Sequence, residues 1–234
     1  MSKIVGYTSS AGVASIRIDD GKVNAMSPAF FDELNAALDS AEREQPGAVV
    51  LVGRAGYFSA GLNVKLLPTL QPAEITRTLQ TFGHTMLRVW ALPIPTVAAV
   101  TGHAVAGGLF LALACDARLV ARGPFRLHAN EHAIGLPLPS FAIAITESAV
   151  PTPTYNELVL HARPFSPEEA LERGIVSGVE DADRVEAAAG ELAGRLTKIA
   201  GAAYAVSKRR LRARALEWAA ARISEEMTGF APKP

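Results

Sequence analysis

The chain has 234 residues and a mass of 24.6 kDa, which predicts one large domain or one domain with a small appendage. Hydrophobic residues make up 49% and charged residues 20% of the chain, so a mainly disordered state is excluded. The 23 basic residues balance the 23 acidic ones, which leaves no overall charge that would attract nucleic acid. A single cysteine, Cys115, excludes an internal disulfide, and no apolar run reaches the length of a membrane span. Because the N-terminus also lacks an apolar signal core, we expect a cytoplasmic α/β protein that does not enter a membrane.

Short β-like runs dominate the first half of the chain. They are predicted at residues 3–8, 12–18, 48–52, 96–100, 117–121 and 125–127. The runs 48–52 and 96–100 consist almost entirely of apolar residues, which is typical of buried strands in a parallel sheet.

Helical patterns separate these runs and then dominate. Ser27 and Pro28 have the residue types of an N-cap and a first helical position, and they open a helix that extends to about Glu44. Further helices are predicted near 72–92, up to about residue 114, and at 203–227. Strand, crossover and strand in this order predict a parallel sheet with right-handed connections, followed by a mostly helical C-terminal part.

Two glycine-rich turns carry the first candidate chemistry. One turn contains Phe58-Ser59-Ala60-Gly61-Leu62-Asn63, the other spans residues 102–108, and each directly follows a predicted buried strand. Small residues at the end of a strand let a ligand approach the backbone, and the second turn also opens a helix with its positive dipole end. Two such turns on successive parallel strands could present two N–H donors to one oxygen, which is an oxyanion hole.

Other glycine-rich and metal-binding motifs do not fit this chain. Neither turn matches the G-x-x-x-x-G-K-[ST] phosphate loop, the dinucleotide pattern G-x-G-x-x-G or the nucleophile elbow G-x-S-x-G. There is no H-E-x-x-H or paired-cysteine spacing, and Glu131-His132 has no second ligand at helical spacing. We therefore expect no metal site.

The sequence resembles the crotonase (enoyl-CoA hydratase/isomerase) superfamily over nearly its whole length. Residues 58–63 resemble its F-x-A-G-x-D segment, and residues 102–116 resemble its G-x-A-x-G-G-G-x-E-L-A-x-x-C-D segment. Residues 20–26 resemble the early N-A-[LM] stretch, and residues 165–176 match the step from a helix into G-[LI]-V.

This resemblance implies an α/β fold: a crotonase-like β-β-α superhelical spiral, placed here at residues 1–180, and a helical C-terminal trimerisation region at 181–234. It also implies an acyl-CoA thioester as substrate, with no separate cofactor because coenzyme A is part of that substrate. A homo-trimer or hexamer is implied, without a nucleic-acid or membrane partner.

The resemblance also assigns site residues. The backbone N–H groups of Ala60 and Gly107 would form an oxyanion hole for a thioester enolate. Substrate-binding roles would fall to Ala60, Gly61, Leu62, Asn63, Gly108 and Phe110.

The departures from the family pattern decide the expected reaction. Where hydratases have a first glutamate this chain has Phe110, and the second family glutamate aligns with Glu131. Hydration uses two carboxylates naturally, whereas a double-bond shift needs one base that removes a proton at C2 and returns it at C4. The single glutamate resembles the Δ3,Δ2-enoyl-CoA isomerase branch, with Glu131 as the catalytic residue. An enoyl-CoA hydratase acting with one glutamate and a non-catalytic acyl-CoA-binding protein are the alternatives.

A basic cluster follows on the last predicted helix, formed by Lys208, Arg209, Arg210, Arg212 and Arg214. Such a run is usually a solvated face. The functional interpretation is that Lys208 and its neighbours bind the phosphates of coenzyme A. Apolar residues on the same helix suggest a packing or trimer face.

Elsewhere we expect structural roles. Cys115 is predicted to be packed core and Asp116 to cap or pair at a helix end, while Glu147 is predicted to be solvated. His128 and His132 are expected to make structural hydrogen bonds rather than to move protons.

Overall fold

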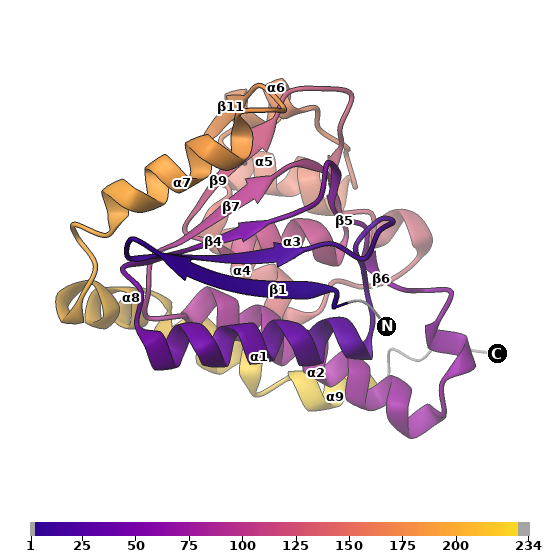
Figure 1. The fold of residues 1–234 in the computed structure, drawn as a ribbon. Helices are drawn as coiled ribbons and strands as arrows, with labels where there is room; N and C mark the ends of the chain where they lie inside the picture. Colours follow the sequence, from indigo (N-terminus) through magenta and orange to yellow (C-terminus); the bar gives the residue numbers. More distant parts are fainter. Residues whose placement is uncertain (1–2, 229–234) are drawn as a thin grey trace.

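The computed structural model describes residues 3–228, and a six-stranded sheet forms its centre (Figure 1). The strands lie in the order β1-β2-β4-β7-β9-β11. They are β1 (Val5–Ser10), β2 (Val13–Ile18), β4 (Ala48–Val52), β7 (Thr96–Val100), β9 (Ala117–Ala121) and β11 (Gly178–Glu180). Only β1 and β2 pair antiparallel; the others are parallel, as the alternation of strands and crossovers predicts.

Residues on β4 alternate between two hydrophobic cores. Val49 and Leu51 belong to one core, while Ala48, Val50 and Val52 belong to the other. A strand that is covered on both faces has no solvent-facing side, which explains why its sequence is wholly apolar.

Helices cover both faces of this sheet (Figure 1). On one side lie α1 (Pro28–Glu44), α2 (Pro72–Ala91), α3 (Gly107–Ala114) and α4 (Ser140–Ala149). On the other side α7 (Val185–Leu196) packs against β4, β7 and β9 through small buried side chains. The predicted start of α1 is confirmed, because Ser27 Oγ accepts the Phe30 N–H at 3.2 Å.

The glycine-rich segments fold into short strands, where the sequence predicts plain turns. A second sheet has the order β10-β8-β5, formed by β10 (Leu127–His128), β8 (Gly102–Val105) and β5 (Gly56–Ser59). A two-stranded sheet pairs β3 (Ala25–Met26) with β6 (Gly61–Leu62). Main strands β4, β7 and β9 are thus each followed by a strand of the second sheet, which produces the β-β-α spiral.

The N-terminal hairpin turns later than predicted. Ser9 and Ser10 belong to β1, and the turn is Ala11-Gly12, with φ angles of 50° and 78°. A glycine at the second position permits this left-handed backbone without a steric cost.

Further helices complete the C-terminal part. They include α5 (Thr152–Tyr155), a π-helical turn at Asn156–Leu160, α6 (Pro167–Glu172), α8 (Ala202–Ala220) and α9 (Ile223–Thr228). The prediction of one continuous helix over 203–227 is wrong, because the chain turns at Ala221-Arg222 and α9 packs against α2. The predicted division at residue 180 stays a prediction, and residues 229–234 of that region lie outside the described residues.

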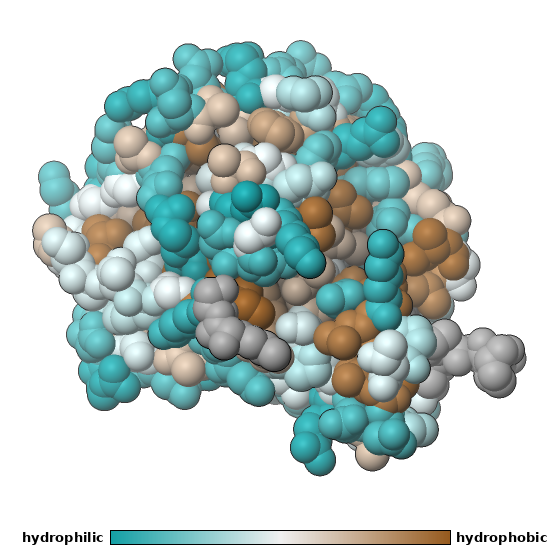
Figure 2. Space-filling view, turned by 45° about the vertical axis from the view of Figure 1, so that its right-hand side comes forward, coloured by the Kyte–Doolittle hydropathy of each residue, from teal (hydrophilic) through white to brown (hydrophobic). Residues whose placement is uncertain are grey.

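In the part of the chain that the structure describes, seven large hydrophobic residues are exposed. Figure 2 shows hydrophobic residues in separate patches between hydrophilic ones on one face of the molecule. Within the described residues, no helix is both long and apolar enough to cross a membrane.

Candidate active site

A cavity of about 280 Å³ lies where the two glycine-rich segments meet α2. Of the predicted site residues, its walls include Ala60, Leu62, Gly107, Phe110 and Glu131. Most of the remaining wall is apolar. The structure thus brings together residues that are up to 71 positions apart in the sequence.

The start of α3 supplies one free backbone donor to this cavity. Leu109 and Phe110 donate their N–H groups to the Ala106 carbonyl, whereas Gly107 stands at the first helical position and has no acceptor within the helix. Ala106 holds φ 50° and ψ −127°, an unusual backbone conformation for a residue other than glycine. This strained residue directly precedes Gly107, and both residues line the cavity.

Ala60 cannot supply the second donor. Its N–H already donates to the Val23 carbonyl at 3.0 Å, so the prediction that Ala60 is an oxyanion-hole donor is wrong. Asn63 N–H likewise donates to the Met26 carbonyl at 2.9 Å, within the pairing of β6 with β3. Because successive N–H groups along a strand point to opposite sides, the N–H of Leu62 points away from β3. Leu62 also lines the cavity, which makes its N–H the candidate donor of this segment.

Gly61, Gly108 and Asn63 do not line the cavity but shape it. A Cβ atom on Gly108 would lie 2.1 Å from the Ser59 carbonyl oxygen, and one on Gly61 would lie 2.9 Å from Gly107 N. Gly61 also has φ +81°. The Asn63 side chain accepts the Leu66 N–H at 3.1 Å. The glycines therefore allow the two segments to approach closely, and Asn63 fixes the loop that follows.

Glu131 is a buried carboxylate without a hydrogen-bond partner at one oxygen. Its exposed fraction is 8%, and Oε2 has no partner among the described residues. Burial raises the pKa of Glu131 to about 7, since the charged form loses its hydration. Phe110, which is 1% exposed, lines the same cavity. A carboxyl group with a pKa near neutrality is suited to take and return a proton.

The sequence did not point to Asn130, the neighbour of Glu131. Asn130 lines the cavity, and its buried Oδ1 lacks a partner among the described residues. The signal that could have indicated Asn130 is its polar side chain next to Glu131. Whether this side chain faces the cavity depends on the fold of the loop.

The two histidines near Glu131, His128 and His132, have different surroundings, and neither residue lines the cavity. His128 Nε2 lies 2.8 Å from the Ala162 carbonyl, to which it must donate, and His132 is exposed. Glu147 is exposed as expected. Within residues 3–228, no cluster of three or more His, Cys, Asp or Glu side chains could hold a metal ion.

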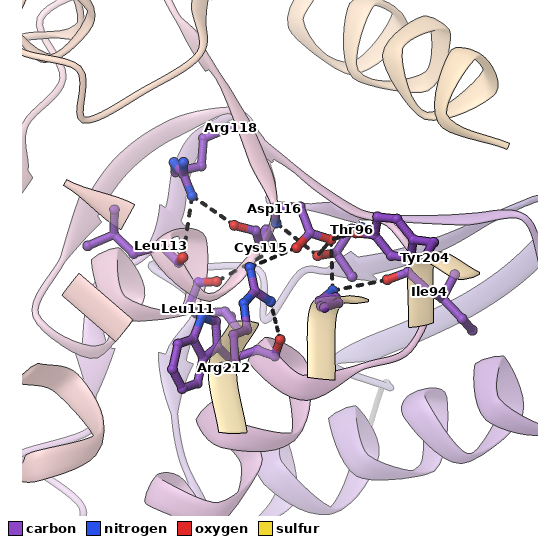
Figure 3. A network of polar contacts seen from close by, with 11 residues as sticks. Ile94, Thr96, Leu111, Leu113, Cys115, Asp116, Arg118, Tyr204 and Arg212 are labelled. Carbon is purple, nitrogen blue, oxygen red and sulfur yellow. Dashed lines mark hydrogen bonds and ion pairs between the residues drawn. The ribbon is translucent and has the colours of Figure 1, made fainter. Parts of the chain in front are cut away.

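Lys208 lies in a buried ionic cluster around Asp116 rather than at the cavity. Figure 3 shows Asp116 of this cluster together with Tyr204 and Arg212. Its ammonium group donates to Asp116 Oδ2 at 2.8 Å and to the Ile94 carbonyl at 3.2 Å, and the residue is 6% exposed. Arg212 and Tyr204 also donate to the Asp116 carboxylate. The structure therefore does not bring Lys208 to a position where it could bind phosphates. The predicted pairing role of Asp116 is confirmed, and Cys115 is buried core as expected.

A β-β-α spiral with a backbone donor at the start of α3 and a buried glutamate opposite an apolar wall defines a crotonase-fold site. A model of the enoyl-CoA hydratase/isomerase family matches residues 8–231, and the chain belongs to this family.

Relatives of known name include both hydratases and isomerases. The chain is 35% identical over 186 residues to a probable enoyl-CoA hydratase of Mycobacterium avium, covering 79% of this chain and 72% of that protein. An apo enoyl-CoA isomerase of Mycobacterium tuberculosis aligns with a TM-score of 0.90 at 34% identity, over 98% of this chain and 100% of that one. The human mitochondrial Δ3-Δ2-enoyl-CoA isomerase aligns with a TM-score of 0.92 at 26% identity, over 97% and 90% of the chains. The chain is thus an enzyme of the crotonase type.

Proposed function

We propose that this enzyme shifts the double bond of an enoyl-CoA thioester from the Δ3 to the Δ2 position, with Glu131 as its base. One observation carries the proposal. Among the described residues, Glu131 is the only carboxylate that lines the cavity, and Phe110 occupies the position where a second would complete a hydratase pair. A single base with a pKa near 7 suits a reaction that removes and returns one proton.

The proposed steps conserve the proton and the electrons. The Glu131 carboxylate removes a proton from C2, and the electron pair of that C–H bond delocalises through the thioester carbonyl and the former double bond as a dienolate. The Glu131 carboxylic acid then delivers the proton to C4, which leaves the double bond between C2 and C3. No water enters the product, in keeping with the largely apolar wall.

The negative oxygen of the dienolate needs hydrogen-bond donors. The N–H groups of Gly107 and Leu62 fill this role in the proposal, because Gly107 has no acceptor within its helix and Leu62 points away from its partner strand. Each such donor contributes about 3–4 kcal/mol to transition-state stabilisation in enzymes that use them. Gly61 makes the pair possible, since a side chain there would contact Gly107 N.

Hydration of a 2-enoyl-CoA is the second candidate, favoured by the names of several relatives. It would need Glu131 both to activate water and to deliver a proton, without a second carboxylate. Two parallel assays distinguish the candidates. One measures isomerisation of 3-enoyl-CoA, and the other measures hydration of 2-enoyl-CoA.

The substitution Glu131→Gln keeps the size of the side chain but removes the base. We expect the isomerase rate to fall by about 10²-fold or more while acyl-CoA binding persists. In the unmodified enzyme, the rate should rise with pH through about 7 as Glu131 ionises. Glu147→Gln, on an exposed carboxylate, is the matched control and should leave the rate unchanged. An equal rate in Glu131→Gln would overturn the proposed mechanism.

For the assembly we propose a homo-trimer or hexamer. Two large hydrophobic side chains on α8 are exposed in the single chain, Leu211 at 84% and Trp218 at 38%. Contact with further copies would cover them, and light scattering at micromolar concentration measures the assembled mass. Cytoplasmic localisation also stays a prediction.

A further inference from the structure

We propose that Met227, on the C-terminal helix α9, closes the acyl end of the cavity and limits the length of the chain it accepts. A hydrogen-bonded pair, Glu226 and Ser140, holds Met227 in place. This inference rests on the proposed function, because it concerns the acyl part of the same substrate.

The exposure of the wall residues distinguishes an open end from a closed end. Val64 and Ile134 line the cavity and are 65% and 58% exposed, so they mark its mouth. Phe82 and Met227 also line it but are only 6% and 2% exposed. The coenzyme A part of a thioester is far larger than 280 Å³, so it must remain at the mouth. The acyl tail then extends toward the closed end.

The α9 helix is attached to the rest of the molecule by both packing and hydrogen bonds. Ile223 is fully buried, and its side chain lies so close to Gly83 of α2 that a Cβ there would be 3.1 Å away. Glu226 accepts the backbone N–H of Ser140 at 2.8 Å and also the Ser140 hydroxyl. Ser140 is the first residue of α4, where a carboxylate is favoured by the helix dipole.

This pair connects two walls of the cavity. Ser140 follows Pro139, and Glu226 precedes Met227; both Pro139 and Met227 line the cavity. The contact spans 86 residues of sequence, so it fixes walls that nothing local would hold together. Pro139 also ends the loop that begins at Glu131. The position of α9 therefore determines both the depth of the cavity and the end of the segment that carries the base.

The size of the cavity agrees with a limit on chain length. Its volume of about 280 Å³ lies just below the range of small-molecule sites, about 300–1,000 Å³. Because the core around it is close-packed, a longer tail could enter only if a wall residue moved or became smaller. Met227 belongs to a short terminal helix, whereas Phe82 lies in the middle of the long helix α2, so Met227 is the wall residue that a substitution can change most simply.

Binding of saturated acyl-CoA thioesters of graded chain length tests this inference without turnover. Calorimetry with the unmodified enzyme should show affinity that rises with chain length and then falls. In Met227→Ala the fall should move to longer chains. The long-to-short ratio of affinities should increase about tenfold, which is the lower end of the effect of one methylene in an apolar pocket. Met227→Phe should move it to shorter chains. An unchanged profile in both variants, with binding intact, overturns the role of Met227. Absence of binding at every length overturns the proposed function and this inference together.

A second set of variants tests the positioning role of Glu226. Glu226→Ala removes the contacts with Ser140, and we expect it to reduce the discrimination against long chains. Glu225→Ala removes an exposed carboxylate on the same helix and is the matched control, with an unchanged profile. If Glu226 acts through Met227, adding Glu226→Ala to Met227→Ala should change the ratio no further. Full additivity of the two effects, or a general loss of affinity at all lengths, would show that Glu226 does not position Met227.

Discussion

Two carboxylates, Asp116 and Glu131, are both removed from solvent, yet their surroundings are opposite. Asp116 accepts hydrogen bonds from the backbone and side chain of Thr96 and from Tyr204, Lys208 and Arg212. Glu131 has one oxygen without a partner among residues 3–228, and it lies beside apolar residues. Burial alone would raise both pKa values, but the neighbouring charges hold the pKa of Asp116 below its ordinary value.

The difference separates a structural cluster at Asp116 from the site proposed for catalysis at Glu131. At Asp116 the hydrogen bonds and the neighbouring charges favour the ionised carboxylate. Its partners come from α8 and from the start of β7, so the cluster also joins these elements to the end of α3. At Glu131 the protein leaves the charge uncompensated, which destabilises the ionised form and raises the pKa toward the value that suits the proposed base. Active sites commonly carry such a cost, whereas structural clusters do not.

Replacing Asp116 should have the largest effect on stability. Asp116→Asn leaves the charges of Lys208 and Arg212 without a counterion, although their side chains are only 4% and 12% exposed. We expect the free energy of unfolding to fall by about 3–5 kcal/mol, measured by urea denaturation at pH 7. Asp181→Asn is the control, because its pair with Arg122 is exposed and should contribute less than about 1 kcal/mol. Equal losses in both variants would show that the buried cluster has no special role.

Replacing Glu131 should increase the free energy of unfolding, the opposite of the effect expected at Asp116. The difference between a pKa of about 7 in the folded chain and the ordinary 4.5 corresponds to about 3 kcal/mol. Because the folded chain holds this proton more tightly, its stability falls as pH rises from about 4.5 to 7 and then stays constant. Glu131→Gln should therefore raise the free energy of unfolding by up to about 3 kcal/mol at pH 8, with little gain at pH 4. A loss of stability at pH 8 would contradict this account of the site.

Adding a second carboxylate at position 110 sharpens the comparison. Phe110→Glu restores the two-glutamate pattern of hydratases, and we expect the ratio of hydration to isomerisation to rise, by up to about tenfold. The new group is buried, so the variant should lose about 1–3 kcal/mol of stability. Phe110→Gln is the control, because glutamine has the shape of glutamate without its charge. This variant should lose stability without gaining hydration activity. If the folded Phe110→Glu variant keeps the original ratio, position 110 does not decide the reaction.

The sequence predicted those parts of the molecule whose signal is local. The strands β4, β7 and β9 begin and end where the sequence predicts them. Nearly every residue of β4 and β7 is apolar, because strands that are covered on both faces need apolar residues, whereas β9 also contains the buried Arg118. The start of α1 follows from Ser27 and Pro28, which supply a cap and a fixed backbone angle at adjacent positions. The pairing of Phe110 with Glu131 in one site came from residue types at motif positions, and the cavity contains both.

Tertiary structure decided everything that depends on a distant partner. Whether Ala60 or Leu62 has a free N–H depends on pairing with β3, which lies more than thirty residues earlier in the chain. In the sequence Lys208 resembles a surface lysine. In the structure its ammonium group is buried and pairs with Asp116, which lies 92 residues away in the chain. The turn after α8 is likewise decided by packing, because α9 gains a buried position against α2 that a straight helix would lose. Local residue preferences specify strands, caps and motif positions, but hydrogen-bond donors and charges are free or occupied only in relation to the folded chain around them.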